Sequence, residues 1–474
     1  MLISRVSTAF MLAALLVVGV APPPGQVEEG VAQTRERPNI VLILTDDLDT
    51  ESVSVMPELK SLLIEEGTTF NNAFVTDPMC CPSRATFLRG QYSHNTHIAG
   101  NSPPEGGFGK FRRLGLERST IATWLDDAGY DTFYAGKYMN GYDDTRYVPP
   151  GWDRWYGWLG MYHSPGGEYR LNQNGHIERY DMDQVHDTDL LKDKAVDFIR
   201  DKWGDGKPFF AYVAPNAPHT PAYVPKRHEG LFSDRSLPRS PSFNEEDMSD
   251  KPRVVRSPQF SHDEVKDLGD LYRKRLASLQ SVDGVVGAIV TALRDTGQLD
   301  STYIIFASDN GYFLGEHRRI DKSLAYEASI RIPLVVRGPG VPAQKVNHLV
   351  INNDFAPTVA QLAGVDPPDF VDGKSFVPLL RTEKPPLQNW RTGFLVEHVT
   401  PTYQALRTND DTYVEWSNGD RELYNLEEDP YQLHNLLNPD LPNPPLPPDT
   451  AGFTAQLGAL RGCKADTCRA AEVQ

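Results

Sequence analysis

Two uninterrupted apolar runs, each followed by paired oxygen-bearing side chains, place the strongest constraint on the fold. The first run covers residues 40–44 and precedes Asp46 and Asp47, and the second covers residues 303–307 and precedes Asp309 and Asn310. Short apolar runs bounded by polar residues are typical of parallel strands that are buried on both faces. Because parallel strands need crossover connections, this pattern predicts an α/β sheet with helices on both faces.

Amphipathic segments supply the helices that such a sheet requires. Apolar residues at three- and four-residue steps predict helices at residues 56–66 and 276–293, each with a glycine soon after it. Weaker patterns predict strands at 209–214 and 332–336 and a helix at 355–362. The Pro-, Ser- and charge-rich segment 229–261 is interpreted as a long excursion over the surface.

Short strands joined by turns replace this pattern after the pair Pro385-Pro386. Four of them are predicted, at residues 393–397, 403–408, 412–416 and 422–424. We therefore predict three parts: a leader and linker at residues 1–35, a main α/β domain at 36–385, and a small C-terminal antiparallel subdomain at 386–474.

The N-terminus carries the features of a secretory signal peptide. Arg5 precedes an apolar run at residues 10–20, and three prolines follow at 22–24. The run is shorter than the roughly 20 residues that a membrane-spanning helix needs. We therefore expect cleavage and secretion, or another extracytoplasmic location, without stable membrane insertion. An uncleaved anchor is the alternative.

Charge and cysteine content narrow the class of protein further. The formal net charge of -17 argues against a general binder of nucleic acid or of an anionic membrane. Of the four cysteines, Cys463 and Cys468 are expected to form a short disulfide loop in an exported chain. The adjacent pair Cys80-Cys81 is poorly placed to bond to itself, so it needs another explanation.

The polar pairs after the two best strands indicate a cation site. In an open α/β sheet, ligands gather beyond the carboxyl ends of the strands, where Asp46, Asp47, Asp309 and Asn310 would meet. Converging carboxylates repel one another unless a cation lies among them, and oxygen ligands suit Ca²⁺ or Mg²⁺. Helix capping or turn formation is the alternative for either pair alone.

Residues 80–90 read Cys-Cys-Pro-Ser-Arg-Ala-Thr-Phe-Leu-Arg-Gly. This segment resembles the Cys-x-Pro-Ser-Arg and Leu-x-Gly signature of the type I sulfatases, in the alkaline phosphatase superfamily. The resemblance extends from about Arg37 to the C-terminal cysteine pair, and it makes 36–385 the catalytic domain. It implies a large mixed sheet sandwiched by helices, with a small C-terminal antiparallel sheet. A buried structural cysteine is the alternative for Cys80.

The resemblance also implies a modified residue and a metal ion. In the family the first cysteine of the motif, here Cys80, is oxidised to formylglycine before folding, by a formylglycine-generating enzyme. A divalent cation, usually Ca²⁺, is then held by the side chains at positions 46, 47, 80, 309 and 310, which here are Asp46, Asp47, Cys80, Asp309 and Asn310. One hydroxyl of the hydrated aldehyde attacks sulfur and forms a covalent sulfo-enzyme, and the second hydroxyl then drives release of sulfate. Serine at position 80 would be trapped as a stable ester.

Four cationic or titratable residues complete the implied catalytic set. Arg84 lies in the motif beside formylglycine, and Lys137 belongs to a Gly-Lys element beside the nucleophile. His219, in Pro-His-Thr-Pro, would contact the sulfate or its ester oxygen, and Lys322 would bind sulfate and help to protonate the leaving group. The order of these residues along the chain supports the set.

One position departs from the family pattern. Many sulfatases carry His two residues after the lysine of the Gly-Lys element, where this chain has Met139, so the base for sulfate elimination is open. The Lys-Tyr-x-Asn version, with Asn140, resembles the N-acetylglucosamine-6-sulfatase, arylsulfatase and extracellular sulfatase branch. Other candidates for the role are His317, His94 and His97, each of which could equally be a structural histidine.

These features together predict a sulfuric ester hydrolase that acts on a sulfated sugar, such as glucosamine-6-sulfate, or on an aryl sulfate. The Pro-Gly-Trp-Asp sequence at residues 150–153 also favours a sugar, and the acidic charge favours a monosaccharide or chain end over a long polyanion. Two alternatives remain: a phosphate mono- or diester hydrolase of the same superfamily, and a catalytically inactive, sulfatase-like binding protein with an unconverted Cys80.

Overall fold

A computed structural model describes residues 37–143, 145–160, 167–386, 389–438 and 449–473. From Arg37 onward the chain forms one compact unit, so the four-stranded C-terminal sheet is part of the same body as the main sheet. The boundary at residue 385 remains a prediction. The predicted signal peptide and linker lie outside the described residues.

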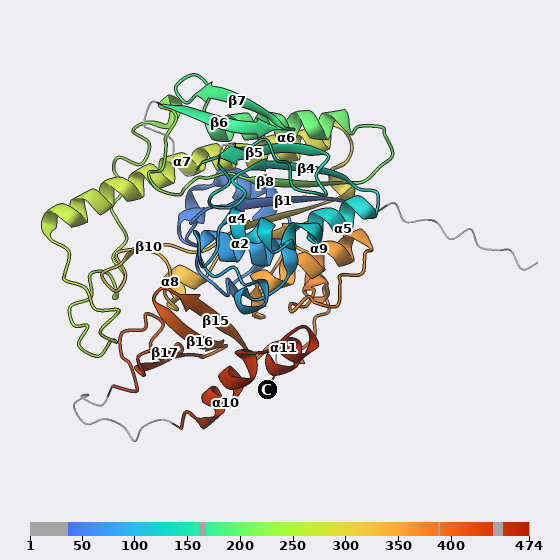
Figure 1. Cartoon of the computed structure of the whole chain (residues 1–474). Helices are drawn as coiled ribbons and strands as arrows, with labels where there is room; N and C mark the ends of the chain where they lie inside the picture. Colours follow the sequence, from blue (N-terminus) through green and yellow to red (C-terminus); the bar gives the residue numbers. More distant parts are fainter. Residues whose placement is uncertain (1–36, 144, 161–166, 387–388, 439–448, 474) are drawn as a thin grey trace, which may run out of the picture. The chain divides into compact units, whose positions relative to one another are not determined.

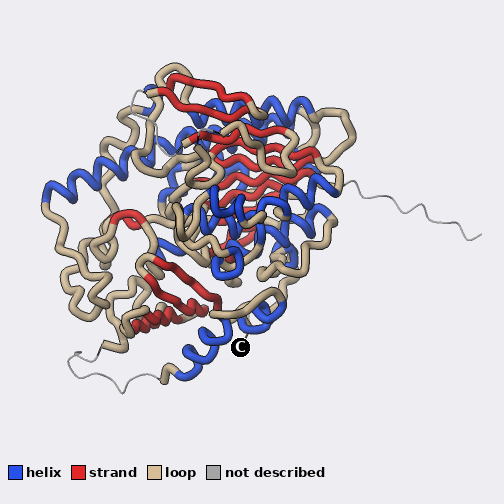
Figure 2. The backbone as a smooth tube through the Cα atoms, viewed as in Figure 1, coloured by secondary structure: helices blue, strands red, loops and turns tan. Residues whose placement is uncertain are grey.

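A ten-stranded mixed sheet forms the centre of the protein (Figures 1 and 2). The five central strands, β9, β1, β8, β4 and β5, run parallel, and antiparallel pairs flank them on both sides. In spatial order the strands are β13 (Gln344–Val346), β2 (Thr68–Phe70), β12 (Leu334–Arg337), β9 (Thr302–Ser308), β1 (Asn39–Thr45), β8 (Phe209–Ala214), β4 (Asp131–Gly136), β5 (Arg154–Leu159), β6 (Glu168–Gln173) and β7 (His176–Asp181). The predicted mixed α/β sheet is confirmed.

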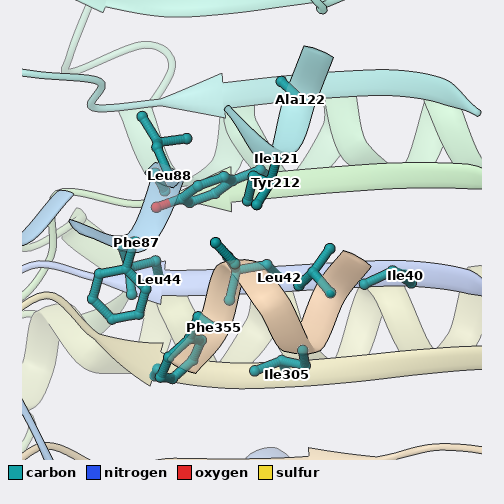
Figure 3. Packing of buried hydrophobic residues seen from close by; sticks show 14 of the residues in the cluster. Ile40, Leu42, Leu44, Phe87, Leu88, Ile121, Ala122, Tyr212, Ile305 and Phe355 are labelled. Carbon is teal, nitrogen blue, oxygen red and sulfur yellow. The ribbon is translucent and has the colours of Figure 1, made fainter. Parts of the chain in front are cut away.

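Helices cover both faces of the sheet. One face carries α2 (Cys80–Arg89), α5 (Ile121–Asp127) and α9 (Phe355–Ala363), and the other carries α1 (Pro57–Leu59), α6 (Asp187–Asp201) and α7 (His262–Asp295). In β1, the side chains of Ile40, Leu42 and Leu44 face the first group of helices (Figure 3), whereas Val41 and Ile43 face the second. This two-sided burial explains why the run 40–44 is uninterrupted.

Two predicted helices differ from the structure in length. The first, expected at 56–66, consists of α1 and a π-helical turn at Lys60–Ile64, where the Glu65 amide bonds to the Lys60 carbonyl. The second is longer than predicted, because a capping box at Ser261 starts α7 fourteen residues before Leu276. By length and composition α7 could cross a membrane, but 72% of its most apolar stretch is buried in the protein, as in a core helix.

The segment 229–261 contains no helix or strand among its residues, all of which are described, and this confirms the predicted excursion. It is nevertheless attached to the body, because Glu245 contacts His317 and Phe243 bridges to Glu316. The other short α-helices and strands of the described residues are α3 (Ser93–Thr96), α4 (Phe108–Arg113), α8 (Glu327–Ile330), β3 (Ala73–Phe74), β10 (Phe313–Leu314), β11 (Ile320–Asp321) and β14 (Val350–Ile351).

A second, antiparallel sheet contains the four predicted C-terminal strands. These are β15 (Gly393–Val399), β16 (Thr402–Thr408), β17 (Asp411–Trp416) and β18 (Arg421–Asn425), and α10 (Ala451–Leu460) and α11 (Asp466–Ala471) follow them. Cys463 and Cys468 form the expected disulfide between the two helices. Buried ionic contacts join this sheet to the main body, as at Glu327, which binds Arg331 and Arg407.

Glu327 gives a stability prediction. Burial alone would raise the pKa of Glu327, but Arg331 and Arg407 outweigh it and lower the pKa from 4.5 to about 2. Its contribution is therefore present above pH 4.5 and is lost as the pH falls towards 2. Glu327→Gln should lower the free energy of unfolding at pH 7 by about 3 kcal/mol.

Urea unfolding at pH 7 and pH 3 measures this effect. The difference between Glu327→Gln and the parent should shrink at pH 3, whereas the exposed control Glu58→Gln should match the parent at both values. A difference that is the same at both pH values would contradict the ionic assignment.

Candidate active site

Four neighbouring parallel strands deliver polar residues to one edge of the main sheet. Asp46 and Asp47 follow β1, Asp309 and Asn310 follow β9, Lys137 follows β4, and His219 lies five residues after β8. The strands are adjacent in the order β9, β1, β8 and β4, so the loops after them meet. The predicted convergence at the carboxyl edge is therefore observed.

The acidic residues of this edge contact one another directly. The Asp47 amide donates to Asp309 Oδ1 over 3.1 Å, and Asn310 Nδ2 donates to Asp47 Oδ1 over 2.7 Å. Asp47 has a φ of 64°, in the left-handed region. Ligating atoms of Asp46, Asp47, Cys80 and His219 lie within 4.8 Å of one another.

This arrangement fits a divalent cation bound through oxygen. Asp47 Oδ2 and Asn310 Oδ1 are buried and accept no hydrogen bond, although buried oxygens ordinarily do. Two carboxylates and an amide oxygen are ligands that Ca²⁺ and Mg²⁺ prefer. Asp309 is shared with other groups, because its oxygens accept from the Asp47 amide and from Arg84 Nε.

Cys80 is the first residue of α2, and its thiol faces this cluster. Its Sγ lies 3.5 Å from Asp46 Oδ1 and 3.2 Å from Lys322 Nζ. Burial, together with the Asp46 carboxylate, raises the pKa of the thiol to about 12 against the effect of Lys137 and Lys322. An unmodified thiol here would be protonated at neutral pH and a weak nucleophile.

Three cations surround the acidic residues. Arg84 lies one turn along α2 and donates from Nε to Asp309 Oδ2 (2.8 Å) and from Nη1 to the Lys137 carbonyl (2.6 Å). Lys137 Nζ donates to Asp46, and Lys322 Nζ donates to Asp47. All three side chains are at most 6% exposed, so their charges act in a medium that screens them weakly.

His219 completes the group. Its Nε2 lies 3.6 Å from Asp47 Oδ2, and its Nδ1 lies 2.6 Å from the Thr220 carbonyl, which favours the tautomer with hydrogen on Nδ1. Burial lowers the pKa of His219 although Asp47 and Asp46 oppose this. A neutral imidazole therefore presents Nε2 to the site.

Neighbouring charges and burial shift the pKa values of the two carboxylates, Asp46 and Asp309, in opposite directions. Burial alone would raise the pKa of Asp46, but the positive charges of Lys137 and Arg84 outweigh it and hold this pKa far below its usual range. Burial and repulsion from Asp46 raise the pKa of Asp309 to about 6 against the effect of Arg84. A divalent cation would relieve this repulsion.

The side chains of His317 and His94 contact groups outside this cluster. His317 Nδ1 lies 2.7 Å from Glu245 Oε2, and its ring stacks on Tyr326. His94 lies between Glu397 and the Cys463 carbonyl, and His97 is exposed. Asn140 is buried and accepts a backbone hydrogen bond from Phe108 through its carbonyl.

Sequence reasoning missed Arg275. This fully buried arginine of α7 donates to the carbonyls of Asp47 and Pro218, and it belongs to no motif. The sequence feature that could have identified Arg275 is its spacing. It precedes Leu279 and Val282 by four and seven residues, which places a charged residue on the apolar face of the helix.

Comparison with known proteins identifies the family. The sequence profile described as "Sulfatase" matches residues 38–365. The chain belongs to the sulfatase family. A second profile, "N-sulphoglucosamine sulphohydrolase, C-terminal", matches residues 315–442 of this sulfatase and covers all four strands of its C-terminal sheet.

Individual sulfatases are similar to this one along most of their length. An arylsulfatase of Volvox carteri is 35% identical over 86% of this chain and 72% of its own length. An N-acetylglucosamine-6-sulfatase of Homo sapiens is 34% identical over 93% of this chain and 87% of its own. The protein is accordingly an enzyme that hydrolyses sulfate esters.

The fold has a counterpart among solved structures. A protein in complex with its substrate D-glucosamine-2-N,6-O-disulfate aligns with a TM-score of 0.72 at 23% identity, over 85% of this sulfatase and 94% of that chain. The likeness confirms the predicted alkaline-phosphatase-like architecture. Sulfatases generally depend on a divalent metal, and the cluster around Asp46 and Asp47 is a candidate acidic site for one.

Proposed function

We propose that this sulfatase uses formylglycine at position 80 and Ca²⁺ to release sulfate from a sulfated sugar of the hexosamine type. The observation that carries the proposal is the position of Cys80, in the first turn of α2 and in contact with both Asp46 and Lys322. No other described cysteine is free and also in contact with acidic and basic groups of this edge.

The site suits attack on a sulfate ester. Cys80 lies at the N-terminal end of α2, where the helix dipole places partial positive charge, and this favours an anionic group there. Lys137 and Lys322 supply full positive charge, Lys137 in contact with Asp46 and Lys322 in contact with Asp47. These groups can neutralise the sulfate oxygens while a hydroxyl of the hydrated aldehyde attacks sulfur.

Each remaining residue has a distinct proposed role. Lys322 lies 3.2 Å from Sγ of Cys80 and would bind sulfate and protonate the leaving alcohol. His219, whose unprotonated Nε2 faces the site, would accept a proton in the elimination step. Bound Ca²⁺, held by Asp46, Asp47, Asp309 and Asn310, would supply charge neutralisation for sulfate and for the nucleophile.

A cavity between α3 and the C-terminal sheet is the candidate pocket for a sugar substrate. It has a volume of about 480 Å³, and its lining includes Asp77, Ala99, Gln404 and Trp416. The Asp77 carbonyl accepts from the Met79 amide directly before Cys80. Two residues beyond Ala99, Asn101 Oδ1 accepts from the Cys81 amide over 2.9 Å. Asp77 and Ala99 thus connect the lining of this cavity to segments that contact residues 79 and 81, on either side of Cys80.

The charges that line this cavity are compensated in pairs. Asp77 binds His398 at 2.8 Å, and His94 binds Glu397 at 2.9 Å. Arg461 binds Glu415. A cavity with paired charges, hydroxyl groups and an aromatic residue suits a neutral polyhydroxylated ring, and the described residues that line it offer no spare cation for a second sulfate. We therefore expect a monosulfated sugar.

Sulfate release from three substrates tests the proposal. N-acetylglucosamine-6-sulfate should give a higher kcat/KM than glucosamine-2-N,6-O-disulfate, and 4-nitrophenyl sulfate should be a poor surrogate. Gln404 lies between Glu397 and Glu415 in the sheet register, so Gln404→Ala should raise KM for the sugar about tenfold and leave the aryl sulfate unchanged.

The exposed Gln361→Ala on α9 is the matched control and should behave like the parent. Preference for the disulfated sugar would contradict the assignment of this cavity. Hydrolysis of phosphate esters but not of sulfate esters would overturn the function itself.

Export is part of the proposal. The leader at residues 1–35 and the Cys463–Cys468 disulfide both suit an oxidising, extracytoplasmic compartment. If the protein is exported, the secreted form should have a mature N-terminus produced by cleavage within the leader.

A further inference from the structure

One buried guanidinium lies beneath the loops that carry the site. Arg275 comes from the middle of α7 and is fully buried. Its Nη2 donates to the Asp47 carbonyl over 2.5 Å, and its Nη1 donates to the Pro218 carbonyl over 3.1 Å. Its guanidinium carbon lies 3.9 Å from the centre of the Tyr312 ring.

Each of these contacts is next to a residue of the proposed site. Pro218 directly precedes His219 and forms a β-bridge with Asp46. Tyr312 is two residues after Asn310. A single side chain thus contacts the loops after β1, β8 and β9, which carry the proposed cation ligands and the imidazole.

The contact with Asp47 has a particular physical consequence. Asp47 is in the left-handed backbone region, which a residue other than glycine occupies only when its surroundings hold it there. The Arg275 hydrogen bond fixes the Asp47 carbonyl, while the carboxylate of the same residue contacts Asn310 and Lys322. Arg275 therefore constrains the direction of the carboxylate.

The ionic partner of Arg275 does not explain its burial. Asp49 Oδ2 lies 3.3 Å from Nη2, but the same carboxylate also accepts hydrogen bonds from the amide and hydroxyl of Ser52. A guanidinium, with donors in a fixed plane, can bind two carbonyls and stack on a ring at once, whereas an ammonium cannot reproduce this geometry.

We propose that Arg275 is a positioning residue that preorganises the divalent-cation site. It does so by fixing the loops of Asp47, His219 and Tyr312 in their positions relative to one another. The inference rests on the proposed function, because it assumes that Asp47 binds the cation. It assigns no contact with substrate to Arg275 itself.

Calorimetric titration of Ca²⁺ into the metal-free protein tests the inference without requiring activity. Arg275→Met, which keeps length but removes every donor, should weaken Ca²⁺ binding at least tenfold. Arg275→Lys should be intermediate, because it keeps the charge but not the planar donors. Asp49→Asn, which removes only the ionic partner, should stay within about threefold of the parent.

A second buried arginine provides the matched control. Arg391 is equally buried and binds Asp354 and Glu472, none of which belongs to the proposed site. Arg391→Met should lower the melting temperature and leave Ca²⁺ affinity unchanged in the folded protein. If Arg275→Met does not fold, Arg275→Lys carries the same comparison.

The outcomes separate the two proposals. Parent-like Ca²⁺ affinity in both Arg275 variants, with a lower melting temperature, would mean that Arg275 is only structural and would overturn the inference. Absence of Ca²⁺ binding by the parent itself would instead overturn the proposed cation site.

Discussion

Replacing Cys80 with serine should lower turnover of every sulfate ester by at least about 10³-fold. The physical reason is that serine has one hydroxyl. It can accept the sulfo group, but it has no second hydroxyl whose deprotonation would expel sulfate. Mass spectrometry of the variant after incubation with substrate should therefore find a stable sulfate ester on the peptide that contains residue 80. The same peptide of the parent should carry an aldehyde in place of the thiol.

Two further variants isolate the cause. Cys80→Ala should be inactive and should remain unsulfated, because it has no nucleophile. Cys81→Ser is the matched control, since Cys81 is equally buried, follows directly in α2 and does not contact the acidic cluster. It should keep turnover within a few-fold of the parent. Parent-like turnover by Cys80→Ala would refute the nucleophile assignment.

The parts of the site that the sequence predicts are those tied to strand ends and to a contiguous motif. Asp46 and Asp309 follow strands whose apolar runs are unambiguous, so the topology of a parallel sheet alone brings them together. Cys80 and Arg84 are four residues apart on one helix, and their relative position follows from helix geometry. Lys322 depends instead on the resemblance to a family, because no local pattern predicts its contact with Asp47.

Other features depend on long-range contacts that periodicity does not encode. The π turn after α1 is one case, and the pairing of His317 with Glu245 is another, since the two residues are 72 positions apart. The cavity between α3 and the C-terminal sheet forms only when Asp77 and Trp416 come together from distant segments. Arg275 is the clearest case, because an arginine on an apolar helix face gives no sign of which loops it will contact.

Asp47→Asn should weaken Ca²⁺ binding roughly 100-fold or more, because affinity at such sites depends on the number of charged ligands. At this position the substitution removes a charge with little change in side-chain shape or backbone conformation. Asparagine has nearly the same shape as aspartate and tolerates the left-handed backbone that Asp47 adopts at a φ of 64°. The loop should therefore keep its course while the site loses one negative charge, and kcat should fall with the loss of bound cation.

Calorimetry of the metal-free variant, together with activity after chelation and Ca²⁺ re-addition, measures this loss. Asp321→Asn is the matched control, because Asp321 lies 3.9 Å from Lys322 but its side chain is 67% exposed. It changes the local charge by the same amount without removing a ligand, so it should change Ca²⁺ affinity by less than about threefold. Equal weakening by both variants would mean that the total negative charge at this edge of the sheet attracts Ca²⁺ and that Asp47 does not ligate it directly.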